Sequence, residues 1–292
     1  MPTQNYDSMA PHARSLLSEL LEDSKLYKSG QDYQEMLDFV VRLRNFAPFN
    51  AFILHIQKPG LRFAASRRDW LNRFRRTVRP GARPLLILWP FAPLVLVYDV
   101  EDTEGDPLPH DVAEAFRAIG AMTDHRIARF LELLGRQGIE TQQIEFGDGL
   151  AGNIGKLGNT MEVIKRIPKT KEKKDTKEKP HYRIRLNKAH DPNIRFATLI
   201  HELAHLYLGH LGEDDYLKIP DRSGLTHDHK ELEAESVCYM ICRRNGVKPD
   251  SDRYLADYVR QEMTVDHFDL YALLKTAGQI ETVLELTAHN YF

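Results

Sequence analysis

The sequence predicts an α+β fold in two domains. In the first half, helical patterns with apolar residues every three to four positions precede two strand patterns, at residues 84–89 and 94–100. In the second half, strand patterns flank a lysine-rich segment, and two helices follow, at residues 192–208 and 227–244. We therefore expect one α+β domain over residues 1–135 and a second domain over residues 136–292.

The composition indicates a folded protein and excludes several classes. Hydrophobic residues make up 42% and charged residues 28% of the 292 residues, as in soluble globular proteins. The longest apolar segment, residues 85–98, is too short to span a membrane and contains Pro90 and Pro93. Two cysteines, Cys238 and Cys242, are too few for a disulfide framework, and no secretory signal pattern opens the chain. We expect a cytoplasmic protein without a membrane partner.

Helices are expected to dominate the front of the chain. The helical patterns cover residues 8–45, with a break at Ser29 and Gly30, and residues 49–57, 67–76 and 113–135. The strand patterns at residues 84–89 and 94–100 lie between the last two of these helices. The first domain therefore combines helices with at least one strand pair.

Basic residues are concentrated in the first domain. Residues 42–83 contain eleven Lys or Arg and a single acid, Asp69, whereas acids outnumber bases after Ala189. This asymmetry indicates a polyanionic partner for the first domain. The residues that we expect to bind DNA are Arg67, Arg68, Trp70, Arg73, Arg75, Arg76 and Arg79.

Guanidinium groups neutralise phosphates and aromatic faces stack on unpaired bases, so this mixture favours single-stranded DNA. The alternative interpretation concerns the aromatic residues: Trp70 and Phe74 are four residues apart and would then belong to the core of an amphipathic helix.

A lysine-rich segment, KRIPKTKEKKDTKEK at residues 165–179, shows no apolar period and is expected to be a solvated loop near residues 165–180. Residues 152–167 and 182–186 on either side alternate as strands do. We expect a long β-hairpin with a lysine-rich tip in front of the next helix.

The helix with the most informative sequence contains the motif HELAH. Asp191 is a favourable N-cap before Pro192, and Gly209 can end the helix. His201 and His205 are four residues apart and so lie on one face, where two imidazoles can share a Zn²⁺ ion. Glu202 can then reach a water held by the metal and accept its proton as a general base.

The third metal ligand is harder to assign from spacing. The pattern HExxHxxGxxH is not met, because Leu208 and Leu211 stand where it needs Gly and His. His210 is a further candidate, although its place just past Gly209 is more typical of a histidine at a helix terminus.

Three glutamates follow on the second helix. Asp228 and Glu231 have the spacing of a capping box, which gives Glu231 a structural role. Glu233 and Glu235 are about 200° apart on a helix, so that only one of them can face the ion.

Two resemblances add to this interpretation. HELAHLYLGH followed by ELEAESVCYM resembles the ImmA/IrrE type of metallopeptidase. This resemblance implies a zincin-like domain whose third ligand is Glu233, with Glu235 as the alternative. Three N-terminal stretches, NAFILHIQKPG, RRDWLNRFRRTVRPGARPLLIL and VYDVEDTEG, resemble the DNA-binding domain of ArdC-like antirestriction proteins.

Together these features predict a zinc-dependent metallopeptidase coupled to a domain that binds DNA, most simply single-stranded DNA, with an antirestriction or DNA-protection role. Its partners would be DNA and a protein or peptide substrate. One alternative is a non-proteolytic DNA-binding protective protein with a structural or vestigial zinc site. Another is a transcription regulator that cleaves a repressor.

Overall fold

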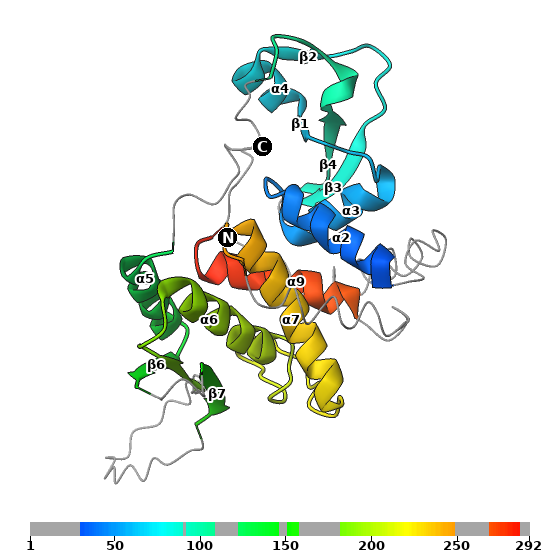
Figure 1. The fold of residues 1–292 in the computed structure, drawn as a ribbon. Coiled ribbons are helices and arrows are strands. Elements are labelled where there is room, and N and C mark those ends of the chain that lie inside the picture. The colour runs from blue at the N-terminus through cyan, green and yellow to red at the C-terminus, as the bar shows by residue number, and fades with distance from the viewer. Residues whose placement is uncertain are drawn as a thin grey trace, which may run out of the picture. The chain divides into compact units, whose positions relative to one another are not determined.

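The computed structural model describes residues 30–89, 92–108, 122–145, 151–157, 182–248 and 269–286. These residues form helices and three small sheets, which confirms the predicted α+β class (Figure 1). Among them, no helix is both long and apolar enough to cross a membrane.

The chain divides into two compact units. One unit comprises residues 122–234, and the other comprises the residues before them together with the residues after Ala234. The expected boundary at residues 135–136 does not coincide with this division, because helix α5 (Asp124–Arg136) packs on strand β6 and helix α6 of the second unit. The predicted functional domains therefore stay a prediction.

The first unit combines helices with two small sheets. Its helices are α2 (Gly30–Arg42), α3 (Pro48–Gln57), α4 (Arg67–Phe74) and α9 (Leu270–Val283), together with the last part of α7 (His227–Arg244). Its strands are β1 (Ala64–Ser66), β2 (Arg76–Val78), β3 (Leu85–Trp89), β4 (Ala92–Asp99) and β5 (Thr103–Gly105), and a short 3₁₀ turn covers Val100–Asp102. The order β1-β4-β3 is antiparallel throughout, and β2 pairs with β5. The predicted strand pair is confirmed.

Two amide side chains of α3 cover the open edge of β3. Asn50 accepts from the N–H of Leu88 and donates to its carbonyl, at 3.0 and 2.9 Å. Gln57 does the same for Leu86, at 2.8 and 2.7 Å. An edge strand with free backbone groups is a template for unwanted pairing, so these amides both satisfy and protect the edge.

A buried ion pair ties the end of α7 to the first unit. Arg244 Nε donates to Glu281 Oε1 at 2.6 Å, and its guanidinium also donates to the carbonyls of Val40 and Phe46, each at 2.8 Å. Buried charges are tolerated only when they are paired and hydrogen-bonded. This network joins α2 to α9 and to the last part of α7, which belong to one unit although α7 and α9 come much later in the sequence.

Helix α4 is shorter than predicted. Ser66 caps it by accepting from the N–H of Asp69 at 3.1 Å, and Arg75 ends it in the left-handed conformation with φ of 50°. Arg76 therefore lies in β2 and not in the helix. The tertiary pairing of β2 with β5 ends a helix that the local pattern would have continued.

Trp70 belongs to the core of this unit. Its side chain is fully buried with Phe63 and Tyr98, and its Nε1–H donates to the carbonyl of Tyr98 at 2.9 Å. Phe74 packs against the same cluster, with ring centroids 5.3 Å from Trp70. The expectation that Trp70 contacts DNA is therefore wrong, because its aromatic faces are occupied by protein.

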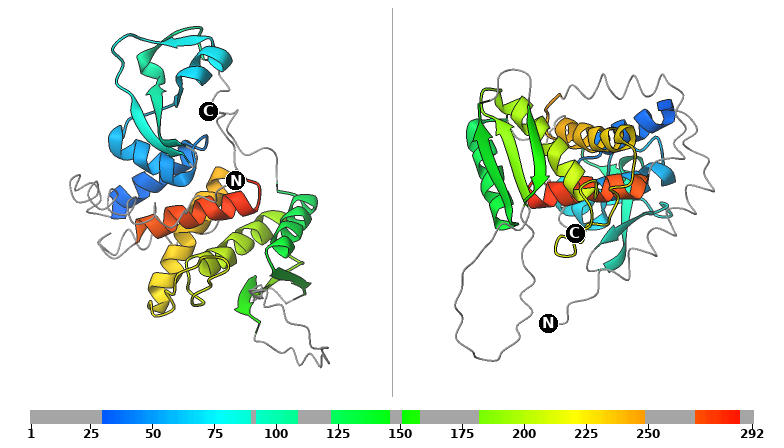
Figure 2. Two further views of the ribbon diagram at one scale, coloured as in Figure 1. Left: turned by 180° about the vertical axis from the view of Figure 1, so that it is seen from behind. Right: turned by 90° about the horizontal axis from the view of Figure 1, so that it is seen from below.

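The second unit is a small sheet covered by helices. It contains α5, β6 (Ile139–Ile144), β7 (Gly152–Lys156), β8 (Tyr182–Asn187), α6 (Pro192–Tyr207) and the start of α7. The order is β6-β8-β7, with β6 parallel and β7 antiparallel to β8. Figures 1 and 2 show α5 and α6 lying against this sheet.

Two sequence predictions concern elements of this unit. The antiparallel pairing of β7 with β8 confirms the predicted hairpin, whereas its lysine-rich tip lies outside the described residues. Of the helix predicted at residues 113–135, residues 113–121 lie outside the described residues; α5 covers Asp124–Arg136, and Thr123 is its N-cap, whose hydroxyl accepts from the N–H of Arg126 at 3.3 Å.

Candidate metal centre

Helix α6 carries the HELAH motif and has well-defined ends. Asp191 Oδ1 accepts from the backbone N–H groups of Asn193 and Ile194, at 2.8 and 3.2 Å, which satisfies two of the donors that a helix start leaves open. The helix ends at Tyr207, and Gly209 follows with a positive φ of 82°. The predicted caps at Asp191 and Gly209 are confirmed.

His201, His205 and Glu231 bring three ligand atoms together. The Nε2 atoms of the two histidines are 3.0 Å apart. The carboxylate of Glu231 lies 3.5 Å from His201 Nε2 and 3.4 Å from His205 Nε2. Among the described residues, this is the one group of three such side chains whose ligand atoms all lie within 4.8 Å of one another.

The capping role expected for Glu231 is wrong. Helix α7 begins at His227, and Thr226 is its cap, because the Thr226 hydroxyl accepts from the N–H of His229 at 3.4 Å. Asp228 thus lies inside the first turn and does not cap the helix. Glu231 is left to face the two imidazoles, and the hydrogen bond from His201 lowers the pKa of its carboxyl.

Glu202 lies next to this group on α6. Burial raises the pKa of the Glu202 carboxyl, and the neighbouring His201 together with the backbone N–H of Ile154 in β7 opposes the rise. A half-buried carboxylate that is more basic than usual has the properties of a general base.

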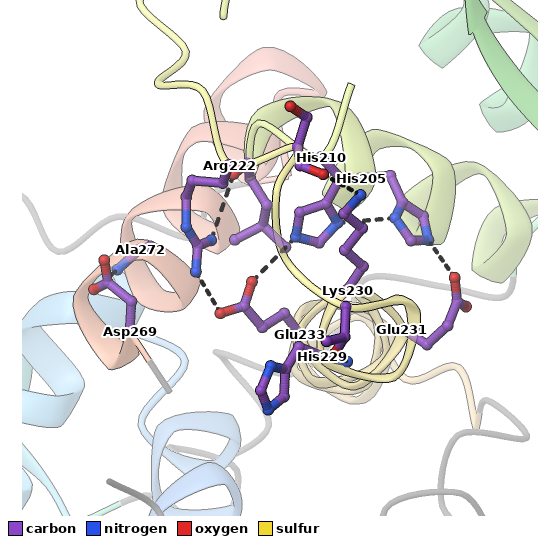
Figure 3. A network of polar contacts seen from close by, with 12 residues as sticks. His205, His210, Arg222, His229, Lys230, Glu231, Glu233, Asp269 and Ala272 are labelled. Atoms are coloured by element: carbon purple, nitrogen blue, oxygen red, sulfur yellow. Dashed lines mark hydrogen bonds and ion pairs between the residues drawn. The ribbon is translucent and has the colours of Figure 1, made fainter. Parts of the chain in front are cut away.

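Glu233 faces away from the histidine pair. Its Oε1 accepts from Arg222 at 2.5 Å, and its Oε2 lies 3.1 Å from Nε2 of His210. Side chains two positions apart on a helix point in directions about 200° apart. Figure 3 shows Glu231 and Glu233 on opposite sides of α7. The structure therefore corrects the expectation from the ImmA/IrrE resemblance, because Glu231 and not Glu233 lies with His201 and His205; the alternative, Glu235, is not in that group either.

His210 connects Glu233 to the histidine pair. Its Nδ1 lies 2.9 Å from Nδ1 of His205, while its Nε2 faces Glu233. Burial alone would raise the pKa of Glu233, but the hydrogen bonds from His210 and Arg222 outweigh it and bring the pKa below its usual value. A charged Arg222–Glu233 pair is thus linked through His210 to one of the two histidines of the HELAH motif (Figure 3).

The predicted DNA-binding residues lie in the first unit and differ in their surroundings. Five of them are exposed: Arg67, Arg68, Arg73, Arg75 and Arg79. Arg76 is half-buried and is held by Thr103 Oγ1 at 2.8 Å and the carbonyl of Asp106 at 2.5 Å. Asp69, the acid of α4, is buried and lies 3.9 Å from Arg73, while the exposed Glu104 of β5 stands opposite Thr77 of β2.

Part of the chain is similar to a known peptidase family. The peptidase M78 family model, described as the IrrE N-terminal-like domain, matches residues 160–241, which include both α6 and most of α7. This segment resembles IrrE. The ImmA/IrrE resemblance that the sequence predicts is thereby confirmed over this range, and we refer to residues 160–241 as the IrrE-like segment.

Solved structures of the antirestriction protein ArdC from plasmid R388 are also similar to the chain. The metal-free structure is 16% identical with a TM-score of 0.40, and covers 87% of this chain and 95% of ArdC. The Mn(II)-bound structure is 17% identical with a TM-score of 0.40, and covers 87% of this chain and 97% of ArdC. No curated protein matches the sequence.

Sequence reasoning missed two features of the IrrE-like segment. Thr226 is itself a good N-cap residue, and this signal would have kept Glu231 open as a ligand. Arg222 has no such signal, because it reaches Glu233 only through the turn between α6 and α7. That turn is fixed by the backbone N–H of Arg222, which donates to the carbonyl of Gly209 at 3.0 Å.

Gly209 is required at this turn, and we expect Gly209→Ala to be strongly destabilising. A Cβ at this position would lie 1.9 Å from the carbonyl oxygen of Pro220, on a backbone with φ of 82°. The matched control is Gly212→Ala, where φ is 95° and no atom lies within 4 Å of the added Cβ. Both variants pay about 1–2 kcal/mol for a left-handed residue. Gly209→Ala should lose a further ~1–3 kcal/mol in urea unfolding from the clash, and equal losses would contradict this account.

Proposed function

We propose that the second unit is a divalent-metal-dependent peptidase, with zinc as its metal and with His201, His205 and Glu231 as the protein ligands. The observation that carries the proposal is the convergence of two imidazole nitrogens and one carboxylate at 3.0–3.5 Å from one another. Three protein ligands with one open position are typical of catalytic zinc sites, whereas structural sites are closed by four.

The residues present fit such an ion. Zinc–nitrogen and zinc–oxygen distances near 2.0 Å in a tetrahedral site place ligand atoms about 3.3 Å apart, which agrees with the separations of His201, His205 and Glu231. Imidazole and carboxylate ligands suit several divalent metals, and zinc is favoured by the mixed nitrogen and oxygen donors. The match of residues 160–241 to a peptidase family supports the same assignment.

Glu202 supplies the acid–base chemistry in this proposal. A divalent cation, when bound, polarises the substrate carbonyl and makes water a stronger acid. Glu202 is half-buried beside the site and partial desolvation raises its pKa, so its carboxylate can accept the proton of the attacking water and then donate it to the leaving amine.

A polypeptide in extended conformation is the substrate that we propose. Among the described strands, β7 pairs with β8 alone, which makes it the outer strand of its sheet. The backbone N–H of Ile154 in β7 reaches Glu202, so this edge runs beside the general base. An extended peptide can add to a sheet edge through main-chain hydrogen bonds, which would bring its carbonyl groups to the site.

The proposal is tested by metal analysis and cleavage of an unfolded protein such as casein. Purified protein should contain about one zinc per chain, lose cleavage on dialysis against a chelator and regain it when zinc is returned. Mn²⁺ and Mg²⁺ in place of zinc report on the choice of metal. Protein that binds no divalent metal, or a metal-loaded protein that cleaves nothing, would contradict it.

A second activity, DNA binding by the first unit, is favoured by the exposed arginines of α4 and its turn. We propose that Arg67, Arg68, Arg73, Arg75 and Arg79 contact phosphates. Trp70 is buried and cannot stack on bases, so it contributes nothing to a preference for single strands. Together with the peptidase, such binding would suit the antirestriction or DNA-protection role that the ArdC-like sequence stretches imply.

Salt dependence tests this second proposal. The triple variant Arg67→Ala, Arg68→Ala, Arg79→Ala should bind DNA more weakly, with a slope of log K against log salt reduced by ~0.7–0.9 for each lost phosphate contact. The control is Arg129→Ala with Arg136→Ala, which removes exposed arginines that pair with Glu132 on α5. Equal slopes for the triple variant and wild type would exclude this surface, and competition between single strands and duplex decides the preferred form.

A further inference from the structure

Four side chains form a continuous polar chain from the loop after α6 to the metal centre. Arg222 donates to Glu233 at 2.5 Å, Glu233 lies 3.1 Å from His210 Nε2, and His210 Nδ1 lies 2.9 Å from His205 Nδ1. We propose that His210 and Glu233 are positioning residues, which hold His205 in the orientation and tautomer that metal binding needs. This inference rests on the proposed function, since it gives the chain a metal ligand to hold.

The contacts allow one consistent placement of the protons. His205 Nε2 is the atom that faces His201 and Glu231, so it must keep its lone pair for the cation. The proton of His205 is then on Nδ1 and is donated to Nδ1 of His210. His210 in turn carries its proton on Nε2 and donates it to the carboxylate of Glu233. Each donor thus meets an acceptor from His205 through His210 to the carboxylate of Glu233. We call this chain of hydrogen bonds the relay.

Arg222 completes the chain by fixing Glu233. Its guanidinium donates to the second carboxylate oxygen, Oε1, so that Oε2 stays aimed at His210. The same guanidinium lies 3.4 Å from the carbonyl of Leu208, at the end of α6. Both oxygens of Glu233 are therefore occupied, and the carboxylate cannot turn toward the metal centre without breaking a charged pair.

Burial makes the arrangement rigid. The side chains of His210 and Glu233 are each 2% exposed, and that of Arg222 is 16% exposed. Polar groups in such positions have no water to replace a lost partner. Metal-binding histidines in proteins are held by a partner on their other ring nitrogen, and removal of that partner weakens metal binding by about 10–100-fold. His210 is the partner of His205 in this sense, and Glu233 is the partner of His210.

The experiment measures zinc affinity by competition with a chromophoric chelator for wild type, His210→Ala and Glu233→Gln. Both variants should bind zinc about 10–100-fold more weakly. Glu233→Gln keeps the shape of the side chain and guards against a failure of His210→Ala to fold. The control is Tyr182→Phe, which removes a buried hydrogen bond to Asp214 of 2.7 Å in the same unit and should keep the affinity of wild type while lowering stability.

The tautomer of each histidine can be measured directly, and a change in stability alone would not alter it. Nitrogen NMR of the full chain should find His205 protonated on Nδ1 and His210 on Nε2 in wild type, and His205 in mixed tautomers in His210→Ala. If wild type binds zinc and both variants keep its affinity, the relay is overturned and the metal centre is not. The same holds if His210 is protonated on Nδ1. Wild type that binds no zinc would instead overturn the proposed centre, and the relay with it.

Discussion

Replacing Glu202 with Gln is expected to abolish peptide cleavage while zinc stays bound. The amide cannot accept a proton from water, and loss of a general base costs about 10²–10⁴ in rate. Glu202 does not belong to the group of His201, His205 and Glu231, so the metal content should remain that of wild type. The measurement is kcat/KM on an unfolded protein substrate beside the zinc content of the same preparation.

The matched control for this variant is Glu213→Gln. It makes the same chemical change at an exposed position in the turn after α6, away from the ligand group. It should cleave as wild type does. Cleavage retained by Glu202→Gln would assign the general base elsewhere, and full protection of incoming DNA in cells carrying Glu202→Gln would favour the non-proteolytic alternative for the biological role.

Replacing Glu231 with Ala is expected to have the largest effect on metal binding. The variant removes one of three converging ligands, and its zinc affinity should fall by more than the ~100-fold seen when only a supporting contact is lost. Zinc at 1,000 times its Kd stabilises a protein that binds it only when folded by about 4 kcal/mol. Wild type should show this rise in thermal denaturation, whereas Glu231→Ala should show little of it.

The three glutamates of α7 give an internal ranking. Glu231→Ala should weaken zinc binding most, Glu233→Gln should weaken it through the relay, and Glu235→Gln should leave it unchanged. If Glu233→Ala emptied the site while Glu231→Ala kept its zinc, the assignment drawn from the ImmA/IrrE resemblance would stand and the geometry of α7 described above would be wrong.

The parts of the site that lie within one helix were predictable from the sequence. The caps at Asp191 and Gly209 and the four-residue spacing of His201 and His205 depend on local backbone geometry, which residue types and spacing determine directly. The pairing of residues 152–156 with residues 182–187 was also predictable, because alternation marks both strands.

The sequence was less able to decide which of several candidate residues occupies a site. Whether Glu231 or Glu233 faces the histidines depends on the rotation of α7 about its axis, and a helix start misplaced at Asp228 assigned Glu231 to a cap. Whether Trp70 is exposed or buried likewise depends on residues distant in the sequence. An aromatic residue among arginines fits both a stacking surface and a core, and packing with Phe63 and Tyr98 decided for the core.

The sequence by itself determined the α+β class, the ends of the HELAH helix and the pair of imidazoles on one face of it, because these follow from periods and caps over a few residues. Only the tertiary structure decided which glutamate joins that pair and what supports it. Arg222, His210 and Glu233 come from a turn, a helix end and a second helix. Their contact depends on how α6 and α7 pack, and no local pattern contains that information.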